Sequence, residues 1–292
     1  MNRIIGQFFQ DVKGCLHFVL VAKLPLIIPF IFLLGCGPVW KGSLDRRYDS
    51  SPIYLDPTKN ELLAVLKSIH RIETVTRFTF EGDVHTTRVA GLATALDRHT
   101  LLTARHVVKL DSFRALTPFG VAEVPLPESA KIEEKSFIIE EDGTRVATVR
   151  IYSDDERDFA ILRTNRELIP FPFSIGNSDE LKIGNVAFLL GNFQTGFSVR
   201  MGNVTQLEFT TYGSKGETAN VNRDIFGISA ITVEGDSGGP ILCVRDGQLE
   251  LIGVVTFLVE PARGLGYCLK INTIADHIRK HIEDRDLLSI WK

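Results

Sequence analysis

The chain has 292 residues, of which 44% are hydrophobic and 24% charged, and its net charge is −3. This composition is ordinary for a globular protein, and the length suits one domain of about 220 residues with a leader, or two small domains. The charge balance lacks the basic excess that nucleic-acid binding requires, so we expect no nucleic-acid partner.

Residues 1–35 have the layout of an export leader. Basic residues precede an uncharged apolar run that begins at Leu24. Its end, Leu-Leu-Gly-Cys at 33–36, resembles a bacterial lipoprotein signal, which implies lipidation of Cys36. An uncleaved membrane anchor and an ordinary secretion signal are alternatives, because the run is short and contains prolines. Each alternative places the body outside the cytoplasm, on the periplasmic or surface side of the cell envelope, with the leader in contact with the membrane.

The residues after the leader change character twice. Residues 36–56 mix glycine, proline, serine and charges without periodicity, and we expect a tether there. Apolar residues then recur at helical spacing between 58 and 72, which predicts a short amphipathic helix. From residue 74, short runs rich in Val, Ile, Phe and Thr alternate with Gly, Asp and Asn, as in an all-β barrel. The expected strands are 74–80, 87–96, 101–103, 136–140, 145–152, 159–163, 186–190, 197–207, 228–233, 241–244, 250–257 and 266–271.

These strands fall into two groups within a domain that we place at 57–292. Pro170 and Pro172 separate the groups, so we expect a junction near 165–178. The predicted barrels span about 74–165 and about 178–271, and a capped helix is predicted at 273–284. The fold class is therefore all-β, with two β-barrels and a C-terminal helix.

Two histidines and two cysteines have ordinary explanations. His277 and His281 lie four residues apart on the predicted helix and could share a metal, but no third ligand is arranged beside them. We therefore expect no metal and no organic cofactor. Cys243 and Cys268 fall in apolar strands, where we expect two small buried hydrophobic residues, with a disulfide as the alternative.

A glycine-rich turn around Ser237 is the strongest chemical signal in the chain. Gly-Asp-Ser-Gly-Gly-Pro occupies 235–240. A serine hydroxyl is a weak nucleophile until a base removes its proton and N–H donors stabilise the oxyanion. The glycines permit a turn that aims the N–H groups of Gly235 and Ser237 at one point, as an oxyanion hole. We therefore predict that Ser237 is a nucleophile, provided that a base and an acid lie upstream.

His106 and Asp158 are the predicted base and orienting acid. His106 follows an apolar strand, at an end where its side chain can face a cleft, and histidine exchanges protons near neutral pH. Asp158 directly precedes the apolar strand 159–163 and would fix the imidazole tautomer. The acidic turn at 154–156 offers alternative acids, but we expect it to be solvated.

These features together resemble the trypsin-like serine proteases, and more closely their bacterial HtrA/Deg branch. The similarity covers roughly residues 74–283. It implies two six-stranded antiparallel β-barrels with the active site between them, and polypeptide substrates. HtrA relatives are often trimers, and the sequence leaves the oligomeric state open. The three most specific blocks occur in the family's order: Thr103-Ala104-Arg105-His106, Asp158-Phe159-Ala160-Ile161-Leu162 and Gly235-Asp236-Ser237-Gly238-Gly239-Pro240.

Two departures from the family pattern matter. HtrA proteases usually carry a peptide-binding PDZ domain after the protease, and we expect none in a chain of this length. The HtrA branch commonly has asparagine at the position of Asp236, whereas aspartate is the trypsin form and pairs there with an N-terminus freed by zymogen cleavage. The similar run at 3–6 lies in the leader, so we do not predict that activation. The sequence does not identify a partner for Asp236.

The resemblance also implies where substrate binds. In this family the floor of the specificity pocket lies six positions before the nucleophile, at Ile231 here, which implies a preference for apolar residues. Thr256 matches a position that hydrogen-bonds the catalytic aspartate in relatives. Thr256, Phe257 and Leu258 would pair with an extended substrate backbone as an added strand.

We therefore expect a serine endopeptidase of the cell envelope that cleaves peptide bonds with a Ser-His-Asp triad. A catalytically latent protease-like protein that binds or senses peptides is the alternative from another class. An esterase on the same fold is a further enzymatic alternative. The intact triad residues and glycines favour the protease, because a binding module needs none of them.

Overall fold

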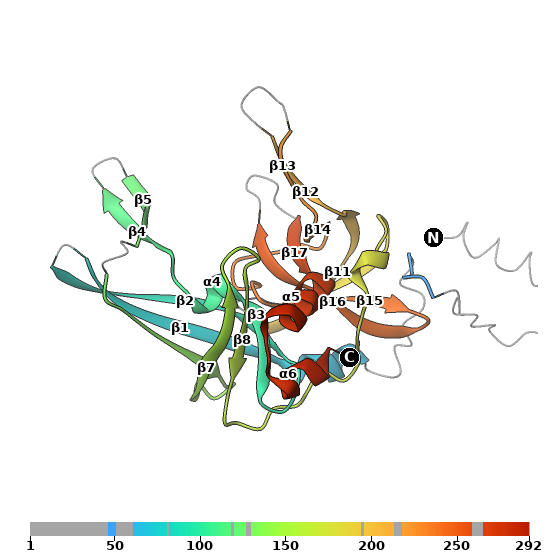
Figure 1. The fold of residues 1–292 in the computed structure, drawn as a ribbon, viewed down its shortest axis with the longest axis horizontal. Helices are drawn as coiled ribbons and strands as arrows, with labels where there is room; N and C mark the ends of the chain where they lie inside the picture. The colour runs from blue at the N-terminus through green and yellow to red at the C-terminus, as the bar shows by residue number, and fades with distance from the viewer. Residues whose placement is uncertain are drawn as a thin grey trace, which may run out of the picture. The chain divides into compact units, whose positions relative to one another are not determined.

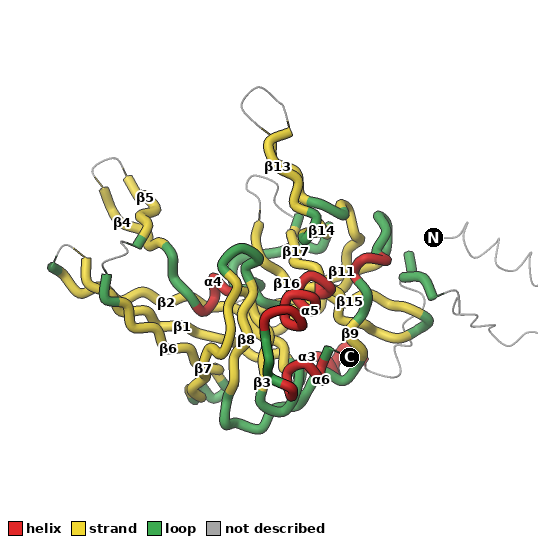
Figure 2. Tube along the Cα trace, viewed as in Figure 1, coloured by secondary structure: helices red, strands yellow, loops and turns green. Residues whose placement is uncertain are grey.

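The structure is a computed structural model that describes residues 46–50, 61–80, 82–117, 120–126, 130–193, 196–212, 218–258 and 265–291. All of these residues lie in one unit of the chain, Gly42–Lys292. Antiparallel strands make up most of them, and the helices are short (Figures 1 and 2). The leader at 1–35 and Cys36 lie outside the described residues.

The first barrel closes through six strands in the order β1-β2-β3-β8-β7-β6. Its closure is the antiparallel pairing of β1 with β6. Residues Phe159 to Leu162 of β8 are all buried, which explains why this strand reads as a continuous apolar run. The strands are β1 (Ile69–Phe80), β2 (Asp83–Ala95), β3 (Thr100–Ala104), β6 (Ile132–Ile139), β7 (Arg145–Asp154) and β8 (Phe159–Arg163).

The second barrel also has six strands in its ring, in the order β15-β10-β11-β14-β17-β16, and β16 pairs with β15 to close it. A short strand, β9 (Ser174–Ile175), adds to β16 in parallel. The predicted pair of six-stranded antiparallel barrels is thereby confirmed. The ring strands are β10 (Val186–Phe193), β11 (Gly196–Gln206), β14 (Ile225–Ile228), β15 (Pro240–Arg245), β16 (Gln248–Leu258) and β17 (Gly266–Lys270).

Two hairpins project from the barrels and were not predicted. One is β4 (Ser112–Thr117) with β5 (Gly120–Pro125), and the other is β12 (Phe209–Tyr212) with β13 (Thr218–Asn222). Each forms its own two-stranded sheet (Figure 1). Their sequences lack the long apolar runs of the barrel strands. Phe209 of β12 packs, partly buried, against the hydrophobic core.

The helices differ from the prediction at both ends of the domain. The first helix, α3 (Glu61–Leu66), is shorter than expected, because Ile69 and Ile72 begin β1 and point into the core of the first barrel region. The C-terminal helix is confirmed as α5 (Ile271–His281). A second helix, α6 (Arg285–Ile290), follows it and was not predicted. The other helical segments within the described residues are α4 (Arg105–Val108) and the 3₁₀ turn η3 (Ser178–Glu180).

Two further expectations are revised. The strand expected at 228–233 is β14, which ends at Ile228, and the residues after it form a loop. Residues 46–50 of the expected tether pack against the second barrel, where Tyr48 is buried and forms a β-bridge with Arg245. No helix within the described residues is long and apolar enough to cross a membrane.

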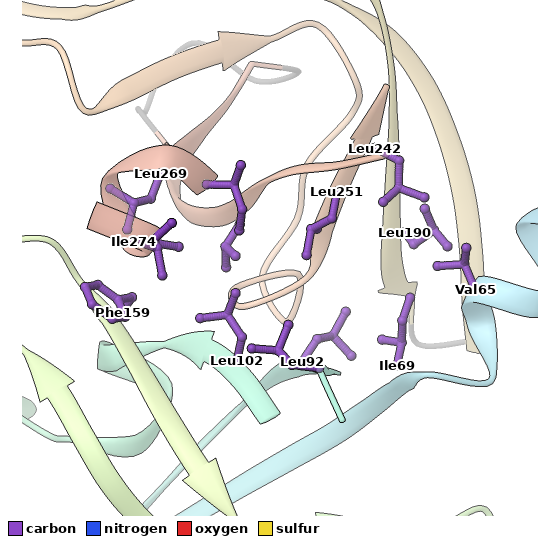
Figure 3. Packing of buried hydrophobic residues seen from close by; sticks show 14 of the residues in the cluster. Val65, Ile69, Leu92, Leu102, Phe159, Leu190, Leu242, Leu251, Leu269 and Ile274 are labelled. Atoms are coloured by element: carbon purple, nitrogen blue, oxygen red, sulfur yellow. The ribbon is translucent and has the colours of Figure 1, made fainter. Parts of the chain in front are cut away.

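The two barrels share one hydrophobic cluster (Figure 3). Burial of each such side chain contributes about 1.5–3 kcal/mol, so the cluster holds the barrels in a fixed relative position. This matters for function because the predicted site residues come from both barrels. The labelled members are Val65, Ile69, Leu92, Leu102 and Phe159 on the first-barrel side, Leu190, Leu242, Leu251 and Leu269 from the second barrel, and Ile274 of α5.

Candidate active site

His106 and Asp158 are brought together by the pairing of β3 with β8. Ala104 at the end of β3 pairs with Phe159 at the start of β8. His106 follows in α4 and Asp158 directly precedes β8, so both lie at the same end of the strand pair. Nδ1 of His106 lies 2.8 Å from Oδ2 of Asp158, and the backbone N–H of His106 donates to Oδ1 at 2.9 Å.

These two hydrogen bonds orient the imidazole. Because Nδ1–H donates to the carboxylate, the neutral ring keeps its lone pair on Nε2. The side chains are 38% and 31% exposed, so neither group lies in the core, and His106 lines a cleft. Nε2 of His106 is therefore available to accept a proton from a group in that cleft.

The turn that carries Asp158 is held by Asp154. Asp158 has φ of 57°, in the left-handed region that asparagine and aspartate tolerate better than most residues. One oxygen of Asp154 accepts the backbone N–H groups of Glu156 at 2.8 Å and Arg157 at 2.9 Å. Asp154 is 6% exposed, so the expectation of a solvated acidic turn is wrong for this residue, although Asp155 and Glu156 are exposed.

Asp155 is exposed and engaged elsewhere. It accepts from Lys109 Nζ at 2.8 Å and from Arg105 Nε at 2.6 Å, and these bonds lower the pKa of the Asp155 carboxyl. Of the acids near this turn, Asp158 is the one that hydrogen-bonds His106.

Ser237 lies in a loop that is hydrogen-bonded to both barrels. The N–H of Leu92 in β2 donates to the carbonyl oxygen of Ser237 at 2.8 Å, and the N–H of Gly238 donates to Val255 of β16 at 2.8 Å. Gly235 and Gly238 have φ of 95° and 82°. A Cβ at Gly238 would collide with the Leu92 carbonyl, so the loop requires glycine there.

His106, Gly235 and Ser237 line one cleft of about 920 Å³. Its other wall comes largely from β2 and the segment that leads to β4. Within the described part of the chain, no hydrogen bond joins the Ser237 hydroxyl to His106. The hydrogen bond between a nucleophile and its base is often long when no substrate is bound, so the missing bond is compatible with a catalytic role for Ser237 and His106.

The backbone N–H groups of Gly235 and Ser237 have no protein acceptor among the residues that the structure describes. The neighbouring N–H of Asp236 is different, because it donates to Val233 at 3.1 Å. Gly235 and Ser237 are partly exposed and line the cleft, so these two donors are available to a ligand oxygen.

Asp236 has a partner that the sequence did not reveal. Its carboxylate is 0% exposed, and Arg200 of β11 binds it with Nη1 at 2.7 Å and Nη2 at 2.5 Å. A signal was present in β11, where Val199 and Met201 are exposed while Arg200 alternates with them and points inward. Alternate side chains of a strand point into the barrel, and a charged residue at such a position needs a buried counter-ion.

The family model for the trypsin-like peptidase domain matches residues 91–254, a stretch that contains His106, Asp158 and Ser237. This match spans more than half of the chain. The chain belongs to the trypsin-like peptidase domain family.

Curated relatives of this trypsin-like domain include bacterial serine endoproteases. A probable periplasmic serine endoprotease DegP-like from Chlamydia pneumoniae is 30% identical over 149 residues, which are 47% of this chain and 28% of the relative. The periplasmic pH-dependent serine endoprotease DegQ of Escherichia coli is 29% identical over 135 residues, 45% of this chain and 28% of that protein. The matched region thus spans less than a third of these relatives.

Solved structures agree on the fold of the trypsin-like domain. The HtrA-type protease AlgW with decapeptide superposes with a TM-score of 0.52 at 18% identity, over 78% of this chain and 68% of that chain. The resemblance to the HtrA branch is thereby confirmed.

The predicted substrate-binding residues of the trypsin-like domain lie in two segments. Ile231 is 61% exposed in the loop after β14 and does not line the cleft of Ser237. Phe257 and Leu258 pair with Tyr267 and Gly266 of β17 on one edge of β16. Their assignment to substrate binding stays a prediction.

Thr256 sits at a bulge between Val255 and Phe257 of β16. Its buried hydroxyl donates to the carbonyl oxygen of Tyr267 at 3.2 Å. The bond from this hydroxyl to Asp158 that the resemblance implied is absent among the described residues. The bulge turns the Thr256 side chain toward β17 instead.

His277 and His281 of α5 have other contacts among the described residues. Nε2 of His277 lies 3.1 Å from Asp154 Oδ2 and contacts the Tyr152 hydroxyl, and its ring stacks on His281. The described residues hold no cluster of three or more metal-ligating side chains. Cys243 and Cys268 are free and buried, as expected, and burial raises the pKa of both thiols.

Proposed function

We propose that this chain is a serine endopeptidase that uses Ser237 as nucleophile, His106 as general base and Asp158 as the acid that orients His106. The observation that carries the proposal is the hydrogen bond from His106 Nδ1 to Asp158, which leaves Nε2 free in the cleft that Ser237 also lines. Membership of the trypsin-like family and the names of the curated relatives support the same activity.

The chemistry follows from this arrangement. Ser237 Oγ attacks the carbonyl carbon of the scissile peptide as its proton passes to His106 Nε2. Asp158 stabilises the imidazolium that forms. The N–H groups of Gly235 and Ser237 hold the oxyanion of the tetrahedral intermediate. His106 then protonates the leaving amine, and a water molecule activated by the same histidine hydrolyses the acyl-enzyme.

Substrate choice and location are finer parts of the proposal. We place the specificity pocket at Ile231, with a preference for apolar residues, and the substrate backbone along residues 256–258. We place the protein outside the cytoplasm in the cell envelope, held there by its leader or by a lipid on Cys36. The leader sequence and the periplasmic location in the relatives' names support this placement.

A fluorophosphonate probe, which bonds covalently to an activated serine, tests the mechanism. The full chain should be labelled, and labelling should disappear in Ser237→Ala and fall by several orders of magnitude in His106→Ala. Ser174→Ala, in the exposed strand β9, is the matched control and should label like the wild type. A folded wild-type chain that is not labelled would contradict the proposal and favour a latent peptide-binding protein.

A positional peptide library tests the pocket. We expect cleavage after apolar residues. Preferred cleavage after Lys, Arg or Glu would contradict the role given to Ile231. Parallel assays with ester and amide substrates would separate an endopeptidase from an esterase.

A further inference from the structure

The Asp236 carboxylate is fully buried and fully hydrogen-bonded. Oδ1 accepts from Arg200 Nη2 at 2.5 Å and from the Asn192 N–H at 3.0 Å. Oδ2 accepts from Arg200 Nη1 at 2.7 Å and from the Val233 N–H at 2.7 Å. Each oxygen therefore has two donors, which satisfies its lone pairs, and Arg200 supplies the balancing charge.

Arg200 is held in place by more than this pair. Its side chain is 11% exposed, and Nη1 also donates to the carbonyl oxygen of Ile231 at 2.5 Å. Gly191 of β10 makes room for the pair, because a Cβ at this position would collide with both the Arg200 guanidinium and the Asp236 carboxylate. Three segments, at residues 191, 200 and 231–236, thus converge on one ion pair.

Asp236 lies between Gly235 and Ser237, the two cleft-lining residues whose N–H groups have no acceptor among the described residues. Its side chain is anchored inside the barrel, so the peptide units on either side are held with the N–H groups of Gly235 and Ser237 unpaired. Without a cation, a buried carboxylate is strongly unfavourable, and the loop would have to move to hydrate it. In this structure the ion pair between Arg200 and Asp236 occurs together with the two unpaired N–H groups of Gly235 and Ser237.

We infer that Arg200 is a positioning residue for the oxyanion hole: it holds Asp236, and through Asp236 it holds the Gly235 and Ser237 N–H groups in register with the nucleophile. The cation comes from a neighbouring strand, 36 residues earlier in the chain, so the loop is formed without a cleavage that frees an N-terminus. This inference rests on the proposed function of Ser237 and its loop.

The test compares the rate of fluorophosphonate labelling in full-length variants. Arg200→Met removes the charge and keeps the length of the side chain. We expect labelling to slow at least about 100-fold, the usual effect of losing an oxyanion donor. In Arg200→Met combined with Asp236→Asn, no buried charge remains, so we expect at least a tenfold recovery. Arg200→Lys should be intermediate, because lysine binds a carboxylate as a point charge rather than through a fork.

Two further variants separate this role from a merely structural one. Arg98→Met removes an exposed ion pair with Glu167, whose side chains are 71% and 66% exposed, and should label like the wild type. Gly191→Ala leaves both charges in place but displaces the pair sterically, so we expect it to slow labelling as Arg200→Met does. If Arg200→Met fails to fold, the labelling rate of Gly191→Ala is compared with that of the wild type instead.

Hydrogen exchange at residues 233–239 gives a readout that does not depend on catalysis. We expect faster exchange in Arg200→Met and a return toward wild-type protection in the double variant. If the wild type does not label but exchange changes in this way, the proposed catalysis fails and the positioning role stands. Two results would overturn the inference. One is that Arg200→Met is labelled as fast as the wild type, or faster. The other is that adding Asp236→Asn to Arg200→Met does not restore the labelling rate.

Discussion

Leu92 of the first barrel donates its backbone N–H to the carbonyl oxygen of Ser237, 2.8 Å away, so the predicted nucleophile is hydrogen-bonded across the boundary between the barrels. His106 and Asp158 belong to the same barrel as Leu92. This bond therefore couples the position of Ser237 to the barrel that carries its proposed base.

The contact between β2 and Ser237 predicts a steric effect at Gly91. A Cβ at Gly91 would lie 2.7 Å from the carbonyl oxygen of Ser237 and 2.6 Å from Val107 Cγ2. We expect Gly91→Ala to slow fluorophosphonate labelling at least about tenfold, because the backbone at Ser237 must move. Gly143→Ala is the control: its Cβ meets no neighbour, its φ of 84° strains only the turn at 140–144, and Gly143 does not line the cleft, so it should keep full labelling. Equal labelling rates in both variants would show that this contact does not set the geometry.

The hydrogen bond between His106 and Asp158 predicts the effect of Asp158→Asn. Asparagine fits the left-handed backbone at this position but cannot accept from both Nδ1–H and the backbone N–H as a carboxylate does. The imidazole would then favour the wrong tautomer. We expect kcat to fall about 10³–10⁴-fold with little change in thermal stability. A variant with normal kcat would remove Asp158 from the proposed triad.

The hydrogen bonds of Tyr48 attach residues 46–50 to the second barrel. Its hydroxyl donates to Glu250 at 2.8 Å and accepts from the Asn177 N–H at 2.8 Å, and burial beside Glu250 raises its pKa well above the usual range. We expect Tyr48→Phe to lower the free energy of unfolding by about 1–3 kcal/mol in denaturant melts. Tyr267→Phe is the control, since the Tyr267 hydroxyl makes no hydrogen bond within the described residues. Equal stability of the two variants would mean that residues 46–50 do not contribute to the fold.

The imidazole of His70 should make the folded protein less stable in mild acid. Its Nε2 is buried without a partner, and burial lowers its pKa, with Glu140 and Arg166 as the nearby charges. The unfolded chain therefore binds a proton near pH 6.5 that the folded chain resists, so stability falls as pH drops below about 6.5. Between pH 7 and 5, the free energy of unfolding should fall less steeply in His70→Gln than in the wild type. The difference in slope should reach up to about 1.4 kcal/mol per pH unit.

The control for this prediction is His99→Gln, because His99 is exposed in a turn. It should keep the wild-type slope. A His70→Gln variant whose stability declines with acid as steeply as the wild type would show that His70 takes up its proton without cost in the folded state.

Much of this protein could be predicted from local sequence patterns. β8 runs as expected over 159–163, because four consecutive buried residues leave an unmistakable apolar run. His106, Asp158 and Ser237 were recognisable because each stands beside such a strand or within a glycine-rich turn, and both features are local. The hairpins β4–β5 and β12–β13 escaped prediction because their strands are short and their sequences carry little apolar periodicity.

The sequence by itself therefore determined the family, the two-barrel architecture and the residues proposed for catalysis. Only the tertiary structure decided which side chains share a buried site. Arg200 reaches Asp236 because the barrel brings β10, β11 and the Ser237 loop together, although the two residues are 36 positions apart in the chain. Thr256 turns toward Tyr267 because a bulge in β16 redirects it. Burial and counter-ion choice depend on the packing of distant segments, which no local pattern of residues encodes.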